Sequence, residues 1–211
     1  MKLLIATRNE GKASEIRDLF TGLPFELVFP ADQKFLEPLP EEADVEHGAT
    51  FVENAAAKAR YFARRSGLVT VAEDSGLEVD ALNGAPGVHS ARFAAMYGER
   101  GRGEEVGDGA NNALLLKRLE GLPEEQRTAR YRCVVAYLET PAGTPQLVEA
   151  TCEGRILTAP RGDGGFGYDP YFWSPELGMT FAEAPLAAKQ RVSHRGRAMR
   201  ALIEVLLRRV S

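Results

Sequence analysis

Long apolar runs and cysteines are scarce in this sequence. A membrane-spanning helix needs about 18 consecutive apolar residues, and no stretch of the chain comes near that length. The N-terminal segment has one lysine and too short an apolar run for a signal peptide. The two cysteines, Cys133 and Cys152, form no C-x-x-C pair, so we expect thiols on or near core strands. These features predict a cytoplasmic protein of a reducing compartment, with no membrane partner.

An excess of positive charge is also missing. The chain has 26 Lys and Arg against 30 Asp and Glu, a formal net charge of -4 and a pI of about 5.6. A nucleic-acid-binding domain normally needs a basic face, so nucleic acid is not expected as a partner. A small anionic ligand stays possible, because a few well-placed cations are enough to bind it.

What is present fits an ordinary globular domain. The chain has 211 residues, of which 44% are hydrophobic and 27% charged, so it is long enough to bury a core. It contains no internal repeat and no low-complexity linker, and we predict a single domain over residues 1–211. Strand and helix patterns alternate early in the chain, and two long strand patterns follow. That order favours an α/β fold with a mixed sheet.

Periodicity and capping signals predict the individual elements. Thr50 and Glu53 have the spacing of a capping box, and Gly67 is suited to end the helix that they begin. The segment at residues 97–108 is rich in glycine and charge, and its role is left open. Helices are expected at residues 10–20, 51–65, 110–120 and from about 192, and strands at residues 3–6, 25–29, 69–72, 77–81, 131–138 and 147–157.

The first polar segment of chemical interest lies between the first strand and the first helix. A polar turn that opens a helix presents free backbone amides, and the helix dipole adds positive potential, so the turn suits a phosphate. Lys12 lies in the first helical turn, which is unfavourable for a cation unless it faces an anion. Ala6 and Ala13 replace residues that a Walker A loop requires, and a capped turn with a solvated lysine is the alternative. The segment consists of Thr7, Arg8, Asn9, Glu10, Gly11 and Lys12.

A second pair of polar residues lies on the helix that follows Thr50. Asn54 and Lys58 are four residues apart and therefore share one helix face. The alanines between them leave room for a ligand to approach closely. A solvated helix face is the alternative interpretation.

Two carboxylates follow an apolar strand pattern directly. We expect Glu73 and Asp74 in a turn that reverses the chain at Gly76, where their oxygens are ready metal ligands. Magnesium prefers carboxylate oxygens together with water and substrate phosphates. One of the two carboxylates could also take a proton from water. An ordinary acidic turn is the alternative.

Residues 162–170 form a glycine-rich loop that contains a literal G-x-G-x-x-G. The dinucleotide-binding interpretation fails, because aromatic residues and a proline follow instead of a helix. Phe166 or Tyr168 could stack on a base, and Asp169 could form a hydrogen bond with it. A hairpin loop with core aromatics is the alternative.

The last segment with candidate function, residues 189–197, has four cations and one histidine close to the start of the C-terminal helix. A helix start repels cations unless something negative lies nearby. His194 and Arg195 could donate hydrogen bonds to a carbonyl of a base. The alternative is a solvated basic turn.

Taken in order, these segments resemble the inosine triphosphate pyrophosphatase family over nearly the whole chain. The resemblance implies a bent mixed β-sheet flanked by helices, in two lobes with the active site in the cleft between them. It also implies a homodimer. The residues that carry it are Phe166-Gly167-Tyr168-Asp169-Pro170, Ser193-His194-Arg195-Gly196, Thr7-x-Asn9-x-x-Lys12, Glu53-Asn54 and Asp74-Ser75-Gly76-Leu77.

The resemblance also implies roles for individual residues. Asp74 would be the catalytic base and a ligand of Mg²⁺, and Glu46 would be the second metal ligand. With Asn54 and Lys58 added from the helix pattern, the expected substrate-binding residues are Thr7, Arg8, Asn9, Glu10, Gly11, Lys12, Asn54, Lys58, Ser75, Phe166, Gly167, Tyr168, Asp169, Lys189, His194 and Arg195.

The expected function is hydrolysis of deaminated purine nucleoside triphosphates, such as ITP, dITP and XTP, to the monophosphate and pyrophosphate. That reaction would keep these nucleotides out of DNA and RNA. Two alternatives stay open. One is a pyrophosphatase for modified pyrimidine or thymidine-type triphosphates, and the other is a non-catalytic nucleotide sensor.

Overall fold

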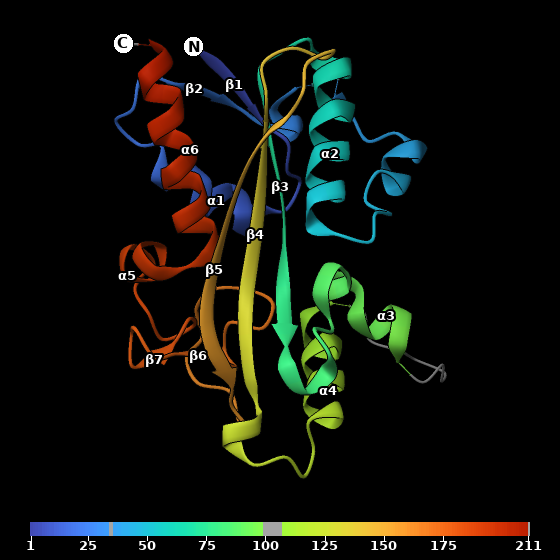
Figure 1. Cartoon of the computed structure of the whole chain (residues 1–211), viewed down its shortest axis with the longest axis vertical. Coiled ribbons are helices and arrows are strands. Elements are labelled where there is room, and N and C mark those ends of the chain that lie inside the picture. The colour runs from blue at the N-terminus through green and yellow to red at the C-terminus, as the bar shows by residue number, and fades with distance from the viewer. Residues whose placement is uncertain (34–35, 99–106, 211) are drawn as a thin grey trace. The chain divides into compact units, whose positions relative to one another are not determined.

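The computed structural model describes residues 1–33, 36–98 and 107–210, and within them seven strands form one sheet (Figure 1). The sheet order is β2-β1-β3-β4-β5-β6-β7. Strand β1 is parallel to β2 and β3, whereas β6 is antiparallel to β5 and β7, so the expected mixed sheet is confirmed. The strands are β1 (Lys2–Ile5), β2 (Glu26–Val28), β3 (Thr70–Val79), β4 (Thr128–Leu138), β5 (Gln146–Ile156), β6 (Phe172–Ser174) and β7 (Met179–Thr180).

Six α-helices lie among the described residues. The helices predicted at residues 10–20, 51–65 and 110–120 are confirmed with shifts of one or two residues at their ends. Helices α3 and α5 have too few residues to show a helical period, and the sequence did not predict them. The helices are α1 (Glu10–Leu19), α2 (Phe51–Ser66), α3 (Phe93–Tyr97), α4 (Asp108–Arg118), α5 (Leu186–Val192) and α6 (His194–Val210).

The chain divides into two compact units, and three long strands contribute to both. The first unit comprises Met1–Asp74, Cys133–Ala150 and Arg195–Ser211. The second comprises Ser75–Arg132 and Thr151–His194. The description of the whole chain as one domain and the position of the site in a cleft stay predictions.

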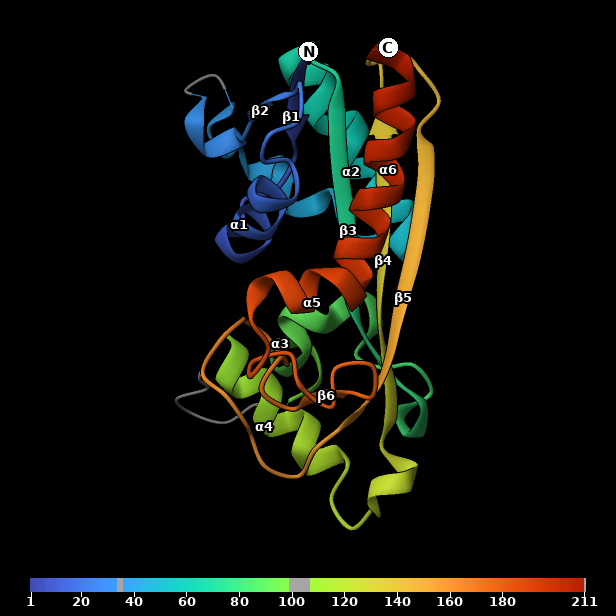
Figure 2. The ribbon, with the colours of Figure 1, turned by 90° about the vertical axis from the view of Figure 1, so that its left-hand side faces the viewer.

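The core of the first unit lies between its strands and two helices. Alternate residues of β1 and β4, together with Val71 of β3, pack against α1 and α6, as the period of two in a strand requires. Figures 1 and 2 show α6 on one side of β3 and β4 and α2 on the other. The buried core residues that α1 and α6 supply are Ala13, Ile16, Ala198, Met199, Leu202, Ile203 and Leu206.

Helix α2 has the ends that its sequence predicted. The Thr50 side chain accepts a hydrogen bond from the Glu53 amide at 3.1 Å, and the Glu53 carboxylate accepts from the Thr50 amide at 3.1 Å. The helix ends at Gly67, whose φ of 69° is easy only for glycine. Because these contacts fix where α2 begins and ends, they also fix the positions of Asn54 and Lys58 along the helix.

The second unit has its own core, in which aromatic rings dominate. Tyr131 of β4 contacts Phe172 and Phe181, with ring centroids 4.7 and 5.8 Å away. Helix α4 adds Leu115 and Leu119 to the same cluster.

One prediction about local structure is wrong. Residues 73–77 do not form a turn, because β3 continues from Thr70 to Val79 without a break. Almost every residue of this strand is buried, and burial outweighs the weak turn preference of Asp, Ser and Gly. The Leu77 amide, inside the expected turn, bonds to the Ser90 hydroxyl at 2.9 Å.

Among the described residues, no helix is long and apolar enough to cross a membrane. Of the glycine-rich segment at 97–108, whose role the sequence left open, residues 99–106 lie outside the described residues. Tyr97 ends α3, and Asp108 begins α4.

Candidate functional site

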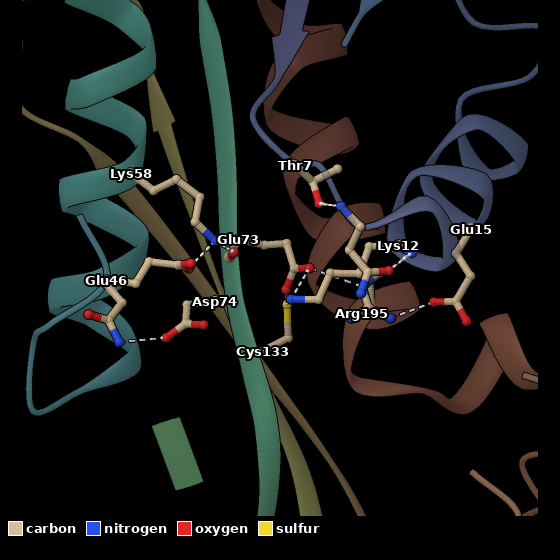
Figure 3. A network of polar contacts seen from close by, with 11 residues as sticks. Thr7, Lys12, Glu15, Glu46, Lys58, Glu73, Asp74, Cys133 and Arg195 are labelled. Carbon is tan, nitrogen blue, oxygen red and sulfur yellow. Dashed lines mark hydrogen bonds and ion pairs between the residues drawn. The ribbon is translucent and has the colours of Figure 1, made fainter. Parts of the chain in front are cut away.

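Glu73 and Asp74 are consecutive residues of β3, and their side chains point to opposite sides of the strand (Figure 3). Extended backbone imposes this alternation on neighbouring residues. Both are buried, with Glu73 3% and Asp74 8% exposed. The acidic pair therefore belongs to two separate clusters of polar side chains in the first unit.

The Asp74 cluster lies on the side of β3 that faces α2. Nδ2 of Asn54 donates to Oδ2 of Asp74 at 3.0 Å. Oδ1 of the same amide accepts from the Gly48 amide at 2.7 Å. One side chain near the start of α2 thus holds both Asp74 and the turn that follows Glu46. Asn54 positions the Asp74 carboxylate and the Gly48 backbone, and whether it also contacts a substrate stays a prediction.

Lys58 carries the positive charge of this cluster. Its ammonium forms an ion pair with Glu46 and donates to the backbone oxygen of Glu73, the latter at 3.0 Å. Burial and the nearby charge of Glu46 raise the pKa of Asp74, although Lys58 opposes that rise. Burial would lower the pKa of Lys58, but Glu46 and Asp74 outweigh it and raise that pKa. The cluster therefore has two carboxylates close to one ammonium, an environment that favours a further cation.

The Glu73 cluster lies on the other side of β3. Lys12 approaches Oε1 of Glu73 at 2.9 Å, and Nε of Arg195 lies 3.4 Å from the same oxygen. Arg195 also reaches Glu15, with Nη1 2.5 Å from Oε2. The Cys133 thiol donates to Oε2 of Glu73 at 3.5 Å. These contacts connect α1, β3, β4 and α6 in one buried network.

The charges of the Glu73 cluster set its protonation states. Burial would raise the pKa of Glu73, but Lys12 and Arg195 hold that pKa well below its usual value. Burial would lower the pKa of Arg195, but Glu73 and Glu15 outweigh it and raise that pKa. Burial and the Glu73 charge raise the pKa of the Cys133 thiol well above its usual value. Glu73 is thus a fixed anion, and Cys133 is a poor nucleophile.

The turn at residues 7–12 has the capped geometry that suits an anion. Oδ1 of Asn9 accepts from the Lys12 amide at 2.9 Å, and the Thr7 hydroxyl accepts from the Asn9 amide at 3.2 Å. Glu10 and Gly11 form the first turn of α1. Binding of phosphate by this segment stays a prediction.

The side chain of Arg8 secures a neighbouring loop. Its guanidinium pairs with Glu42, Nε to Oε1 at 2.5 Å and Nη2 to Oε2 at 2.8 Å. Nη2 also donates to the Leu36 carbonyl at 2.6 Å. A bidentate pair of this kind fixes orientation as well as distance. Arg8 therefore anchors the loop before α2, and any contact that it makes with a substrate stays a prediction.

A divalent metal fits the Asp74 cluster by its chemistry. Among the residues that the structure describes, no group of three or more His, Cys, Asp and Glu side chains is arranged to hold a metal ion. Glu46 and Asp74 provide two carboxylates, and Mg²⁺ commonly uses one or two carboxylates plus water and phosphate oxygens. Glu73 is already bound by Lys12 and Arg195 on the opposite side of β3. The donor set is thus suited to a metal that completes its coordination with water and a phosphate ligand.

The glycine loop of the second unit is built around Asp169. Oδ2 of Asp169 accepts from the Phe166 amide at 2.9 Å and from Nζ of Lys189 at 2.6 Å. A Cβ on Gly165 would lie 2.1 Å from that same oxygen, and its φ of 73° also favours glycine. The ammonium of Lys189 lies 5.2 Å from the centroid of the Phe166 ring. The glycines thus let the backbone wrap closely around a buried ion pair.

His194 lies in a second aromatic environment of the same unit. Its ring stacks on Tyr131, with centroids 4.6 Å apart and planes 7° from parallel. It is only 4% exposed. The hydroxyl of Tyr131 also donates to Oδ1 of Asp169 at 3.5 Å. Tyr131 therefore links His194 to the Asp169–Lys189 ion pair.

The site residues predicted from the sequence are distributed between the two units. Five further residues contact them or Glu73 that the sequence did not predict as site residues. Only Glu15 had a detectable signal, because it lies three residues after Lys12 on the same helix. The first unit holds Thr7, Arg8, Asn9, Glu10, Gly11, Lys12, Glu46, Asn54, Lys58, Asp74 and Arg195, and the second holds Ser75, Phe166, Gly167, Tyr168, Asp169, Lys189 and His194. The added residues are Glu15, Cys133, Tyr131, Asp108 and Asn112.

The mixed β-sheet with its helices makes this an α/β protein, and its candidate site consists of buried clusters of acidic, basic and aromatic side chains. Comparison with known proteins identifies its family. The chain matches the Ham1 family over residues 3–205 and belongs to that family. A solved structure of a HAM1 protein from Coxiella burnetii superposes with a TM-score of 0.82 and 36% identity, covering 99% of each chain.

Curated relatives agree on the family. The dITP/XTP pyrophosphatase of Desulforamulus reducens is 46% identical over 209 residues, which is 99% of this chain and 96% of that protein. The dITP/XTP pyrophosphatase of Geobacter sulfurreducens is 49% identical over 199 residues, covering 94% and 92%. The resemblance stated from the sequence motifs is thereby confirmed.

Proposed function

We propose that this protein hydrolyses deaminated purine nucleoside triphosphates, such as ITP, dITP and XTP, to the monophosphate and pyrophosphate. The observation that carries the proposal is the buried Asp74, held by Asn54 and lying near the Glu46–Lys58 pair, with a raised pKa. Burial, a raised carboxyl pKa and nearby cations are the conditions of a general base in phosphate chemistry. The curated relatives that match nearly the full chain carry the name dITP/XTP pyrophosphatase.

Glu46 and Asp74 would hold Mg²⁺ in this proposal. The metal would supply positive charge to the phosphate oxygens at the reacting centre. Lys58 pairs with Glu46, and its charge partly opposes the rise in the pKa of Asp74, so it offsets the charge of the two carboxylates. The same ammonium then lies close to the phosphates.

The chemical step assigned to Asp74 is proton transfer. Its carboxylate takes a proton from water, and the water oxygen attacks the α-phosphorus. The bond between that phosphorus and the bridging oxygen of the β-phosphate breaks, and pyrophosphate leaves. Asn54 orients Asp74 by its hydrogen bond at 3.0 Å. Most of the rate in such a reaction comes from positioning and charge stabilisation.

Cations and amides of the first unit are assigned to the phosphates. The turn at residues 7–12 presents the amides at the start of α1, where the helix dipole is positive. Lys12 is held by Glu73 at 2.9 Å and is only partly exposed. It would have to divide its ammonium between Glu73 and a phosphate oxygen. The fixed negative charge of Glu73 thereby tunes how strongly Lys12 holds the substrate.

The second unit is assigned to the base and the cations near it. Phe166 or Tyr168 would stack on the purine, and His194 would donate to its 6-keto oxygen. Adenine carries an amino donor at that position, so a buried donor would be left unpaired against it. Guanine also has the keto group, and its rejection must come from the shape of the pocket. Base contact by Arg195 stays a prediction, because its guanidinium bonds to Glu15 and Glu73.

The remaining expectations belong to the same proposal. We expect a cytosolic homodimer that acts on a small nucleotide and needs no nucleic acid. Sedimentation of the purified chain with and without nucleotide tests the oligomeric part directly.

The decisive experiment is product analysis. Purified protein is incubated with ITP and Mg²⁺, with and without a chelator, and the products are resolved. We expect inosine monophosphate and pyrophosphate, loss of both on chelation, and much slower turnover of ATP. Diphosphate plus orthophosphate would place the attack at the γ-phosphorus and refute the mechanism.

The same assay decides between the alternatives. A panel of modified pyrimidine triphosphates is included beside the purines. Preference for a pyrimidine would refute the base assignment, and binding without any turnover would identify a nucleotide sensor. Binding of oligonucleotides that weakens strongly with salt would indicate a nucleic-acid-binding module.

A further inference from the structure

The backbone N–H and C=O of Gly167, which belong to successive peptide groups, are both held by side chains of helix α4. Its amide donates to Oδ2 of Asp108 at 2.6 Å. Its carbonyl accepts from Nδ2 of Asn112 at 2.9 Å. Asp108 and Asn112 are four residues apart on α4, so they present their side chains on the same helix face. All three residues belong to the second unit.

The two hydrogen bonds are of the kinds that specify orientation. The bond to Asp108 is short and charge-assisted, which makes it stronger than a neutral one. Asn112 is 9% exposed, and its Oδ1 is buried with no hydrogen-bond partner among the residues that the structure describes. A buried amide oxygen without a hydrogen-bond partner costs free energy. The hydrogen bond from Nδ2 of Asn112 to the Gly167 carbonyl offsets part of that cost.

Gly167 lies within the glycine loop of residues 162–170. Phe166 precedes Gly167, and its amide bonds to Asp169. Tyr168 follows it, and its hydroxyl donates to the Ser90 carbonyl at 2.8 Å. Gly167 has a φ of 63°, so its own backbone imposes little preference for this conformation over others. The contacts from α4 therefore select one conformation for a residue that is otherwise permissive.

We propose that Asp108 and Asn112 are positioning residues that set base selectivity by fixing the backbone on both sides of the Gly167 Cα before the nucleotide binds. The inference rests on the proposed function, since it deepens the role of the Phe166–Asp169 loop in reading the base. A loop fixed in advance loses less entropy on binding and holds its stacking ring and its hydrogen-bonding groups in one geometry. A loop that moves can adapt to a wrong base.

Asn111, the neighbour of Asn112 on helix α4, provides a matched control. Asn111 is also buried, but its amide bonds to the Ala94 amide at 2.9 Å and to the Ala91 carbonyl at 3.1 Å. It therefore secures the backbone around the start of α3 and does not touch the glycine loop in the contacts described. Loss of Asn111 should lower stability without loosening Gly167.

The experiment combines two readouts on the full chain. Hydrogen–deuterium exchange of the segment at residues 162–170 reports on how firmly α4 holds Gly167, without any substrate. Steady-state pyrophosphate release from ITP and from ATP gives the ratio of their kcat/KM values. Five proteins are compared: the wild type, Asn112→Ala, Asp108→Ala, Asp108→Asn and Asn111→Ala.

We expect faster exchange of the loop in Asn112→Ala and Asp108→Ala. The ITP over ATP ratio should fall about tenfold in each, mainly through a higher KM for ITP, as the loss of one hydrogen bond implies. Asp108→Asn keeps an acceptor for the Gly167 amide and should restore most of the ratio. Asn111→Ala should keep both the ratio and the slow exchange, at a lower melting temperature.

Three results would overturn the inference. One is unchanged loop exchange in Asn112→Ala and Asp108→Ala, and another is an unchanged ITP over ATP ratio in both. The third is an equal fall of the ratio in Asn111→Ala, which would show a general effect of stability. Should the alanine variants not fold, Asp108→Asn alone must still show intermediate exchange. Absence of ITP turnover in the wild type would refute the proposed function instead. Hydrogen–deuterium exchange of the loop would then still test whether Asp108 and Asn112 fix the Gly167 backbone.

Discussion

Glu73 and Asp74 share a peptide bond, yet the pKa of one is lowered and that of the other is raised. The cause is the alternation of β3, which turns Glu73 toward Lys12 and Arg195 and Asp74 toward Asn54 and Glu46 (Figure 3). Two carboxyl groups driven in opposite directions are a sign of divided roles. Glu73 is a permanent anion that holds cations, and Asp74 is the carboxylate able to exchange a proton.

Replacing Asp74 by Asn tests the proton-transfer role. The amide oxygen can still accept from Asn54, so the fold should be kept. Loss of the base should lower kcat for ITP by at least about 100-fold. Pyrophosphate release measures the rate, and a melting curve provides the control. Normal turnover by a folded variant would refute the role of Asp74.

Replacing Glu73 by Gln tests its role as a fixed anion. Arg195 and Lys12 would lose a buried partner, which typically costs about 3 kcal/mol of unfolding free energy near neutral pH. The pKa of Glu73 is lower in the folded chain, so its contribution is fully present above the unfolded value of about 4.3 and is lost progressively as the pH falls from there through the lower folded pKa. Urea unfolding of both proteins at pH 7 and pH 4 measures the difference.

The control for that measurement is Glu26→Gln. Glu26 forms an exposed pair with Lys2 at 3.3 Å, and such a pair contributes less than about 1 kcal/mol. A Glu73→Gln variant as stable as this control at pH 7 would contradict the ion-pair account. A difference that grew toward pH 4 would contradict its sign.

Replacing Lys58 by Met tests the metal assignment without relying on turnover. Lys58 is the ammonium that balances Glu46 and Asp74 in the metal-free chain. Its removal should lower the melting temperature without metal and enlarge the rise that Mg²⁺ produces, since ligand binding stabilises the folded state. Thermal melts across a Mg²⁺ titration report both effects. An identical Mg²⁺ response in the two proteins would argue against Glu46 and Asp74 as ligands.

Replacing His194 by Phe tests base recognition. The Phe ring can keep the stack on Tyr131, whose centroid lies 4.6 Å away, but it has no hydrogen-bond donor. We expect kcat/KM for ITP to fall about tenfold or more and that for ATP to change little. The ratio of the two constants is the measurement. Full discrimination against ATP in this variant would remove His194 from the base-reading set.

Local signals in the sequence determined much of this protein. The capping box of Thr50 and Glu53 and the glycine at residue 67 define the ends of α2, because those contacts form within a few residues of chain. The helical period predicted the last helix, and α6 supplies a large part of the first core. The motifs identified the family because they specify chemistry at fixed positions along the chain.

Only the tertiary structure decided which polar groups meet. Glu73 and Asp74 look like one acidic pair in sequence, and the sequence placed them in a turn. Burial of β3 on both sides extended the strand through them and sent their side chains apart. Arg195 looked like a donor for a base, and its contacts with Glu15 and Glu73 link residues separated by more than a hundred positions. Such pairings depend on packing between distant segments, which no local pattern encodes.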